Sequence, residues 1–417
     1  MKIALLSQTD ASRSGASRIA GDLTVLLNTV PGVTAHHWRG YARGPLQPHE
    51  RSLLGGRAMR LLHRAGRSLS RRIGLPDLLT PELAVFLRAG GLSYDICHFF
   101  DISTAISPLT LAWVARRRPV VWTFQDFAAF TGGCVYPDTC TAFHTRCGPC
   151  PQLSEWPLLT RIDRTGFLQG VKRRLAARGA YLPLVSSRWL AGEAMKSGMY
   201  RTPPLVLPNP IDEETFRPEE KAAARRALGL PAESFIVLVS ALDVRQRRKG
   251  TEAAILALQA LERPHGVLLV GRSDPATEAR FGSSLLRAAG LVMDRPLLAR
   301  HYAAADVFLF PTRAEAFGIA VAETMACGTP VVGFGAGALP ELIDHGSDGW
   351  LAAPGDVGGL VEGLRRLFDD RAALAAWSSA ASAKARRRYA RAPFLERHLE
   401  IYRQILRERL PAGRKAP

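Results

Sequence analysis

Two glutamates, Glu315 and Glu323, stand in a stretch whose composition predicts a ligand site. A strand is expected to end at Phe310, a loop to carry Glu315, and a helix to begin near residues 317–319. Free backbone amides at a helix start suit a phosphate, and carboxylates suit sugar hydroxyls, which donate hydrogen bonds. Two glutamates at this spacing are also typical of a solvated helix face, so spacing alone leaves both interpretations open.

Short apolar strands alternate with helices along both halves of the chain. In the first half we expect strands at residues 2–6, 95–99, 119–123 and 182–185. A polar loop from Ser7 to Gly15 and a helix at about 16–27 should follow the first of them. In the second half we expect strands at residues 235–239, 267–270, 307–310 and 330–333. Continuous apolar strands of this kind form parallel sheets covered by helices on both faces.

The proline-rich segment Pro203–Pro210 separates the two halves and is expected to connect two domains. The predicted fold class is therefore α/β, with two Rossmann-like doubly wound domains facing a central cleft. Their expected bounds are residues 1–200 and 201–394. Because ligands bind at the carboxyl ends of such sheets, the loop that carries Glu315 should lie at a binding edge.

The composition is that of an ordinary globular protein with a basic excess. The chain has 417 residues, with 55 Lys+Arg against 37 Asp+Glu, which gives a formal charge of +18. This excess suits phosphate-rich partners, but the chain has 48 Arg and only 7 Lys, a bias that a GC-rich genome also produces. No apolar stretch reaches the ~18 residues of a membrane span, so we expect a cytoplasmic protein.

Several motifs in order resemble family 4 of the retaining GT-B glycosyltransferases. The stretch around Glu315 is similar to the family's pattern of Glu, seven residues, Glu, with Phe-Gly inside it and Met-Ala-x-Gly-x-Pro after it. Other similar segments are Val185–Leu190, Val206–Asp212, Arg248-Lys249-Gly250 and Ala304–Pro311. The resemblance covers most of the chain. It implies a GT-B fold, with a C-terminal helix at about 395–410 that packs back on the first domain.

The resemblance also implies roles for residues of the second domain. Glu315 would lie against hydroxyls of the donor sugar, and Glu323 would bind the ribose. Lys249, with Arg248 or Arg245, would neutralise the diphosphate, whose charge the reaction must stabilise. The sugar and diphosphate would be lined by the backbone of Phe317, Gly318 and Ile319.

In the first domain, the resemblance places Gly15 where the family's glycine-rich loop meets the donor phosphate and the acceptor. Asp126 would orient the acceptor or the donor, or would cap the next segment. His98 is either a donor-binding residue at a strand end or a satisfied core histidine. Gln125 stands where this branch of the family has a His, and an amide cannot serve as a general base.

The implied activity is metal-independent transfer of a sugar, hexosyltransferase-like, from a nucleoside-diphosphate donor to an acceptor hydroxyl with retention of configuration. By resemblance, the acceptor is a glycan or lipid-linked chain of surface polysaccharide or lipopolysaccharide biosynthesis. A GT-B epimerase or phosphorylase is the alternative enzyme. A nucleic-acid-binding protein is the alternative outside enzymes, but aromatics are only 8% of the chain and do not interleave with the arginines.

Four cysteines fall within seventeen residues of the first half, and three interpretations stay open for them. They could hold a structural zinc, remain reduced or loosely paired thiols, or carry redox chemistry through a Cys-Gly-Pro-Cys motif. No catalytic cofactor is expected. The candidate ligands are Cys134, Cys140, Cys147 and Cys150.

Arginines recur at three- and four-residue steps over residues 57–73, with apolar residues on the opposite face of the expected helix. Such a helix can lie at the anionic inner face of a membrane, where a lipid-linked acceptor would wait, or can pack on its own domain with a solvated arginine face. The arginines are Arg57, Arg60, Arg64, Arg67 and Arg71.

Overall fold

A computed structural model describes the chain except residues 10–13, 42–44, 77, 284 and 410–417. The described residues form two compact units. The first comprises residues 1–208 together with the chain from Phe394 onward, and the second comprises Asn209–Pro393. The division thus falls after Pro208, eight residues beyond the expected bound. The reason is that Leu205–Val206, within the expected linker, forms the strand β7 and pairs with the strand before it.

The first unit holds a parallel sheet of seven described strands in the order β3-β2-β1-β4-β5-β6-β7. This order is that of a doubly wound sheet, reversing between β1 and β4. The strands are β1 (Lys2–Thr9), β2 (Thr34–Tyr41), β3 (Glu50–Ser52), β4 (Ile96–Phe99), β5 (Val120–Phe124), β6 (Leu182–Val185) and β7 (Leu205–Val206). The helices are α1 (Gly15–Leu27), α2 (Arg57–Arg72), α3 (Glu82–Arg88), α4 (Pro108–Ala115), α5 (Thr165–Ala177), α6 (Arg188–Lys196) and α15 (Arg391–Arg409), with 3-10 turns η1 (Gly91–Ser93), η2 (Phe127–Ala129) and η3 (Ala142–His144).

The second unit repeats the design with the described strand order β10-β9-β8-β11-β12-β13, again all parallel. The strands are β8 (Ile236–Asp243), β9 (Gly266–Arg272), β10 (Leu286–Gly290), β11 (Val307–Phe310), β12 (Val331–Phe334) and β13 (Gly349–Ala352). The helices are α7 (Lys221–Leu228), α8 (Thr251–Gln259), α9 (Pro275–Ala279), α10 (Arg295–Ala304), α11 (Ile319–Ala326), α12 (Leu339–Leu342), α13 (Val357–Asp369) and α14 (Arg371–Arg388), with the 3-10 turn η4 (Arg247–Lys249).

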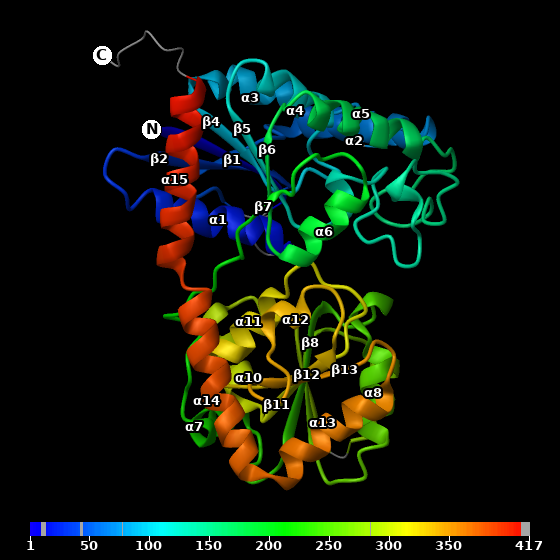
Figure 1. The fold of residues 1–417 in the computed structure, drawn as a ribbon, viewed down its shortest axis with the longest axis vertical. Helices are drawn as coiled ribbons and strands as arrows, with labels where there is room; N and C mark the ends of the chain where they lie inside the picture. The colour runs from blue at the N-terminus through cyan, green and yellow to red at the C-terminus, as the bar shows by residue number, and fades with distance from the viewer. Residues whose placement is uncertain (10–13, 42–44, 77, 284, 410–417) are drawn as a thin grey trace. The chain divides into compact units, whose positions relative to one another are not determined.

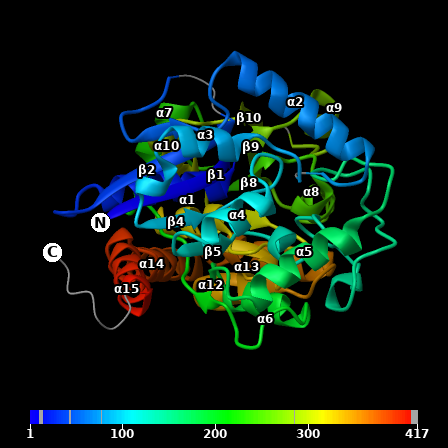
Figure 2. The ribbon, with the colours of Figure 1, turned by 90° about the horizontal axis from the view of Figure 1, so that it is seen from above.

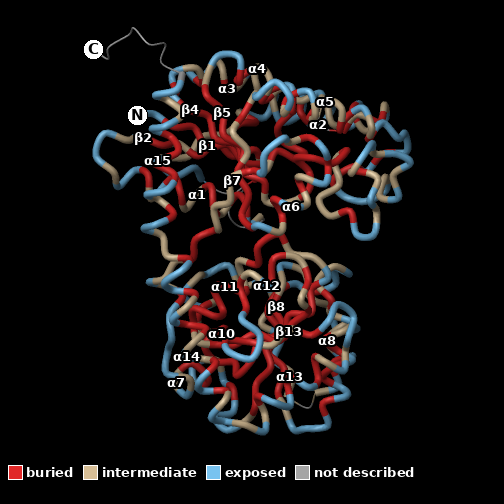
Figure 3. Tube along the Cα trace, viewed as in Figure 1, coloured by how far each residue is buried: buried red, intermediate tan, exposed pale blue. Residues whose placement is uncertain are grey.

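Helices cover both faces of the second sheet, as continuous apolar strands require. Figure 1 shows α8 and α13 on one side and α7, α10, α11 and α14 on the other. Between them lies a core that includes Val237, Leu269, Leu309 and Trp377. Figure 3 shows the same buried strands as a central layer in each unit. Two Rossmann-like units are therefore confirmed, while the cleft expected between them stays a prediction.

Strand β2 escaped the sequence analysis because it lacks a continuous apolar run. It carries the buried polar residues His37 and Arg39, each of which contacts a side chain of a neighbouring strand. His37 Nε2 lies 2.7 Å from the Ser7 hydroxyl, and Arg39 lies 3.1 Å from Glu50 of β3. Strand β1 also continues to Thr9, so the expected loop from Ser7 begins three residues too early.

The C-terminal helix begins at Arg391, earlier than expected, and joins the first unit from Phe394 onward. Its Tyr402 is buried beside β4. None of the helices in the described part of the chain has the length and apolarity that a bilayer crossing needs.

Candidate functional site

The strongest candidate site lies where the strand order of the second sheet reverses. Strands β8 and β11 are neighbours at this point, and both present their carboxyl ends to the same edge. The chain after β8 forms the turn η4, and the chain after β11 forms the loop that carries Glu315. Doubly wound sheets bind ligands at such a reversal, so topology alone brings these two segments to a binding edge.

Glu315 meets two cations from η4. Its Oε2 accepts from Lys249 Nζ at 2.7 Å and from Arg248 Nη1 at 3.3 Å. Arg248 Nη1 also donates to the carbonyl oxygen of Ala314 at 2.6 Å. The side chains stay partly accessible, with 14% of Glu315, 17% of Lys249 and 26% of Arg248 exposed. Two cations against one carboxylate leave a net positive cluster, which suits an anionic ligand.

Burial and charge act against each other in this cluster. Burial raises the pKa of Glu315, but Lys249 and Arg248 outweigh it and lower its pKa overall. Burial lowers the pKa of Lys249, while Glu315 opposes that shift. Lys249 Nζ also lies 5.4 Å from the centroid of the Phe310 ring, a cation–π contact at the end of β11. Glu315 is therefore ionised at neutral pH, and charge holds the two segments together.

Gly250 allows η4 to approach the Glu315 loop. Its φ is +73°, and a Cβ at this position would lie 1.8 Å from the carbonyl oxygen of Pro311. Next to it, the Arg248 carbonyl oxygen accepts from Arg313 N at 2.9 Å and from the Thr312 hydroxyl at 3.1 Å. The glycine of the Arg-Lys-Gly motif thus has a steric role: it lets Arg248 and Lys249 reach the carboxylate.

A second glycine, Gly337, supports Glu315 and was missed by the sequence analysis. Its φ is +61°, and a Cβ there would lie 2.4 Å from the carbonyl oxygen of Glu315. The following amide, Ala338 N, donates to that oxygen at 2.9 Å. The dipeptide follows β12 in a loop without charged residues, so the only available signal was a glycine after a predicted strand.

Helix α11 begins beside Glu315, as predicted. Gly318 caps its start with a φ of +97°, in the left-handed region that favours glycine. Phe317 is buried, with its ring centroid 5.4 Å from that of Tyr389, and Ile319 is half-buried. The first amides of a helix have no intrahelical acceptor, so this turn offers donors next to the cationic cluster.

Glu323 is buried inside α11, with only 2% of its surface exposed. The solvated-face interpretation of the two glutamates is therefore wrong. A buried carboxylate needs polar partners, and its predicted contact with the ribose stays a prediction.

Arg245 stands apart from the cluster. It donates a bidentate pair of hydrogen bonds to Asp243, from Nε to Oδ1 at 2.9 Å and from Nη2 to Oδ2 at 2.7 Å, and its Nη1 lies 3.6 Å from Asp274 Oδ2. Nearly half of its side chain is exposed. Of the two arginines that the sequence left open, Arg248 is the one beside Glu315, and the predicted role of Arg245 on the diphosphate is not supported.

The predicted residues of the first unit lie at the carboxyl edge of its sheet. Gly15 is the exposed first residue of α1, and Ser14 separates it from the undescribed residues 10–13. Asp126 caps η2, its Oδ1 accepting from Ala128 N at 2.7 Å, which is the capping role that the sequence left open. Gln125 is half-buried beside it. An acceptor contact by any of these residues stays a prediction.

His98 is a core residue, and its predicted donor-binding role is wrong. It is fully buried in β4, and both ring nitrogens are engaged. Nδ1 lies 2.6 Å from the Tyr402 hydroxyl of α15, and Nε2 lies 2.7 Å from the Thr123 hydroxyl. Burial lowers the pKa of His98 well below its ordinary value. The histidine therefore fastens the C-terminal helix to the first sheet.

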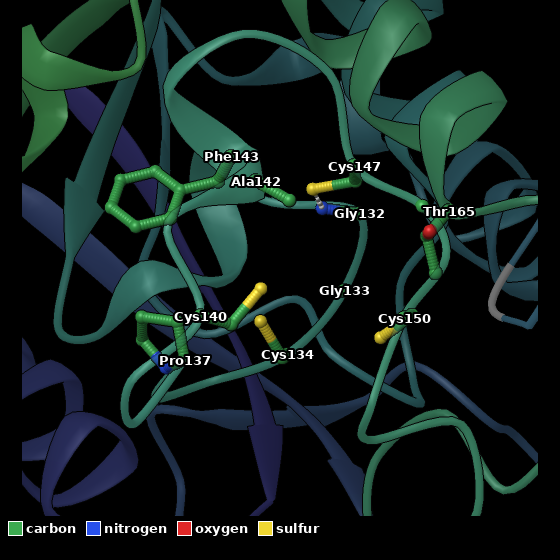
Figure 4. A pocket seen from close by; sticks show the side chains of 11 residues that line it. Gly132, Gly133, Cys134, Pro137, Cys140, Ala142, Phe143, Cys147, Cys150 and Thr165 are labelled. Carbon is green, nitrogen blue, oxygen red and sulfur yellow. Dashed lines mark hydrogen bonds between the residues drawn. The ribbon is translucent and has the colours of Figure 1, made fainter.

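The four clustered cysteines, Cys134, Cys140, Cys147 and Cys150, line one small cavity (Figure 4), which also touches Phe143 and Thr165. All are free thiols, and Cys147 Sγ accepts from Gly132 N at 3.2 Å. Burial raises the pKa of Cys134 to about 12. As the side chains lie, no three His, Cys, Asp or Glu in the described part of the chain are placed to hold a metal ion. A structural zinc on the predicted ligands Cys134, Cys140, Cys147 and Cys150 stays a prediction.

Comparison with known proteins agrees with this site. Residues 233–370, which include η4, Glu315 and α11, match the family model of glycosyl transferases group 1. A D-inositol 3-phosphate glycosyltransferase from Thermobispora bispora is 33% identical over 50% of this chain and 53% of its own length. The lipopolysaccharide core biosynthesis mannosyltransferase LpsB of Rhizobium meliloti is 28% identical over 60% of this chain and 75% of its own.

The chain spans about half the length of the inositol-phosphate relatives that it matches. Among solved structures, Anabaena HepE in complex with UDP-glucose has a TM-score of 0.69 at 20% identity, covering 97% of this chain and 100% of HepE. The expected GT-B fold class is thereby confirmed. Over residues 233–370, the chain is similar to the glycosyl transferases group 1 family.

Proposed function

We propose that the chain is a glycosyltransferase that moves a sugar from a nucleoside-diphosphate donor to an acceptor hydroxyl. The observation that carries this proposal is the cluster of Lys249, Arg248 and Glu315 at the reversal point of the second sheet. The net positive charge and the first amides of α11 suit a diphosphate, and the carboxylate suits sugar hydroxyls. HepE, a protein of the same fold, is described in complex with UDP-glucose.

In this proposal the cations stabilise the leaving group. The bond from the anomeric carbon to the diphosphate oxygen breaks, and the charge that develops on that oxygen lies against Lys249 and Arg248. The same departing oxygen accepts the proton of the acceptor hydroxyl, so no separate general base is needed. Gln125, where the family's branch has His, is compatible with this route.

Retention of configuration and independence of metal belong to the proposal. Glu315 already accepts hydrogen bonds from two cations, and this occupation makes it a poor nucleophile for a covalent intermediate. The two cations also supply the charge that a divalent ion supplies to leaving diphosphates in metal-dependent transferases. Attack on the same face from which the diphosphate leaves is the route that fits both features.

The acceptor proposed for this reaction is a glycan or lipid-linked chain of surface polysaccharide or lipopolysaccharide biosynthesis. It is supported by the resemblance to LpsB, which is named for the lipopolysaccharide core. We place the protein in the cytoplasm, working at the inner face of the membrane. A GT-B epimerase or phosphorylase would use a similar donor, and analysis of the product distinguishes them.

The test is a thermal-shift screen against a panel of nucleoside-diphosphate sugars, followed by product analysis with the best one. A true donor raises the Tm by mass action, and a Lys249→Gln variant should lose most of that rise. A panel that leaves the Tm of the wild type unchanged would refute the donor site.

A further inference from the structure

Helix α2 packs on its unit through polar residues and turns a leucine face outward. Its buried residues are His63 and Ser70, whereas Leu61, Leu62 and Leu69 are 64%, 56% and 53% exposed. The Tyr41 hydroxyl lies 3.4 Å from His63 Nδ1 and anchors the inner face. The helix therefore packs on its own unit with a solvated arginine face, as one of the two interpretations expected, but it does so through polar residues and leaves its leucines exposed.

The arginines form a separate row along the other flank of the helix, opposite Leu62 and Leu69. Arg57, Arg60 and Arg64 are exposed, and the helix carries no acidic residue. Arg67 is partly engaged, because it donates to the Tyr41 hydroxyl at 2.6 Å. At 1.5 Å per residue, the 16 residues extend about 24 Å. Parallel apolar and cationic rows of this length fit a flat surface that is apolar within and anionic at its boundary.

A second exposed apolar group adjoins the end of α2. It lies in the segment that precedes and begins α5, where Trp156, Leu159, Ile162 and Phe167 are 43–49% exposed. The Thr160 hydroxyl donates to the Arg71 carbonyl oxygen at 2.7 Å.

The join between the two groups is close. Gly74 lies so near Ile162 that a Cβ there would come within 2.5 Å of its carbonyl oxygen. Figures 1 and 2 agree in placing this segment and α2 on the same side of the first unit. The segment with Trp156 therefore lies against the C-terminal end of α2.

Charge around the second group is mixed but mostly basic. Arg161 and Arg164 are exposed beside Ile162. The acids are Glu155 and Asp163, and Asp163 already accepts from Cys150 N and from Thr165. A tryptophan with an apolar body and a polar edge is the side chain that membrane interfaces favour.

We propose that these residues form one membrane-docking surface for an anionic phospholipid bilayer. The surface consists of Leu61, Leu62, Leu69, Trp156, Leu159, Ile162 and Phe167, with Arg57, Arg60 and Arg64 on the lipid phosphates. This inference rests on the proposed function, because a lipid-linked acceptor presents its hydroxyl at such a bilayer. It extends the arginine stripe predicted from sequence: the leucines and the Trp156 segment would insert into the bilayer, and the arginines would orient the protein on its phosphates.

Vesicle flotation tests the surface with the full chain, using phosphatidylcholine vesicles with and without phosphatidylglycerol. The wild type should bind the anionic vesicles and bind the neutral ones weakly, and added salt should weaken binding. Changing Arg57, Arg60 and Arg64 together to Gln should weaken partitioning roughly a hundredfold, since each basic residue contributes about fivefold. Changing Leu62 and Leu69 to Ser, or Trp156 to Ser, should weaken it at least about tenfold.

Matched variants control for net charge and exposed apolar surface. Arg226, Arg386 and Arg387 changed together to Gln remove the same charge from exposed helix positions of the second unit and should leave binding unchanged. Changing Val25 and Leu256, which are 50% and 45% exposed, to Ser removes exposed apolar surface elsewhere in the chain and should also leave binding unchanged. Wild-type protein that stays unbound, or surface variants that bind as well as wild type, would overturn the inference.

The same variants separate this inference from the proposed function. All of them should keep the Tm rise caused by a nucleoside-diphosphate sugar, since none touches the Lys249 cluster. Loss of vesicle binding with that rise intact supports a docking surface separate from the donor site. Vesicle binding without any donor-induced rise would refute the glycosyltransferase proposal and leave the docking surface standing.

Discussion

Replacing Lys249 by Gln removes one of the two charges that face Glu315 while keeping most of the side-chain volume. Lys249 Nζ makes the shorter contact with that carboxylate, 2.7 Å against 3.3 Å for Arg248. The lost cation is the one proposed to stabilise the departing diphosphate. Removing one such donor costs about 10²–10³ in kcat, or roughly 2.7–4 kcal/mol.

Folding stability should fall less than activity. Breaking a fully buried ion pair costs about 3–5 kcal/mol, but Arg248 remains and both partners are partly exposed, so about 1–2 kcal/mol is expected. The pKa of Glu315 should also rise, because burial raises it and only Arg248 would remain to lower it. In the wild type its lowered pKa adds stability above the ordinary value of 4.5, and that contribution is lost as the pH falls through the lower folded pKa. The variant should lose part of this contribution at neutral pH.

The assay is the initial rate at saturating donor and acceptor, together with urea unfolding near neutral pH. Arg245→Gln is the matched control, because Arg245 is close in sequence but lies against Asp243 and Asp274. It should keep kcat within about threefold, since an exposed pair contributes little. A Lys249→Gln enzyme with full kcat, or an equal loss in Arg245→Gln, would refute the assignment of the leaving-group cations.

Four further outcomes are expected. Gly250→Ala should lower the free energy of unfolding in urea by about 2 kcal/mol or more, since the new Cβ would meet Pro311. Gly229→Ala, which has a similar φ and open space around it, should lower it by only about 1 kcal/mol. Equal losses in the two variants would contradict the steric role of Gly250. Burial lowers the pKa of His398 to about 4. The free energy of unfolding should therefore fall by up to about 1.4 kcal/mol per pH unit as the pH falls from 6.5 to about 4, and His398→Asn should reduce this slope. An unchanged slope in the variant would contradict the role of His398. NMR of the product should show the same anomeric configuration as the donor, and the initial rate of transfer should not change when Mg²⁺ or Mn²⁺ is added. Inversion of configuration, or activation by either metal, would refute the proposed route. Purified protein should carry about one zinc per chain by elemental analysis, which Cys147→Ser abolishes and Cys97→Ser does not; metal-free wild type would refute a structural zinc.

The central strands were predictable because burial on both faces demands continuous apolar runs. Strands β6 and β11 have the predicted bounds, β4 begins one residue later than predicted, and β5 and β12 are each shifted by one residue at both ends. Edge strands and β2 could not be found this way. The edge strand β3 is only half-buried, and the polar side chains of β2 contact Ser7 and Glu50 of the neighbouring strands, which no local pattern reveals.

The residues of the site could be predicted from the sequence, but which side chains contact one another could not. The family pattern located Glu315, Lys249 and Gly318, and the topology of β8 and β11 explains why they meet. The choice between Arg245 and Arg248 depended on the backbone of η4, which turns one arginine toward Glu315 and leaves the other on Asp243. His98 was misassigned because its partner Tyr402 is 304 residues away in sequence, beyond any local signal.

The most direct measurement is a crystal structure of the chain grown with UDP, the nucleotide of the HepE complex. The diphosphate should lie within hydrogen-bond distance of Lys249 Nζ and of the first amides of α11, with the ribose hydroxyls against Glu323. A diphosphate bound elsewhere, with the ion pair of Lys249 and Glu315 untouched, would contradict the account of this site.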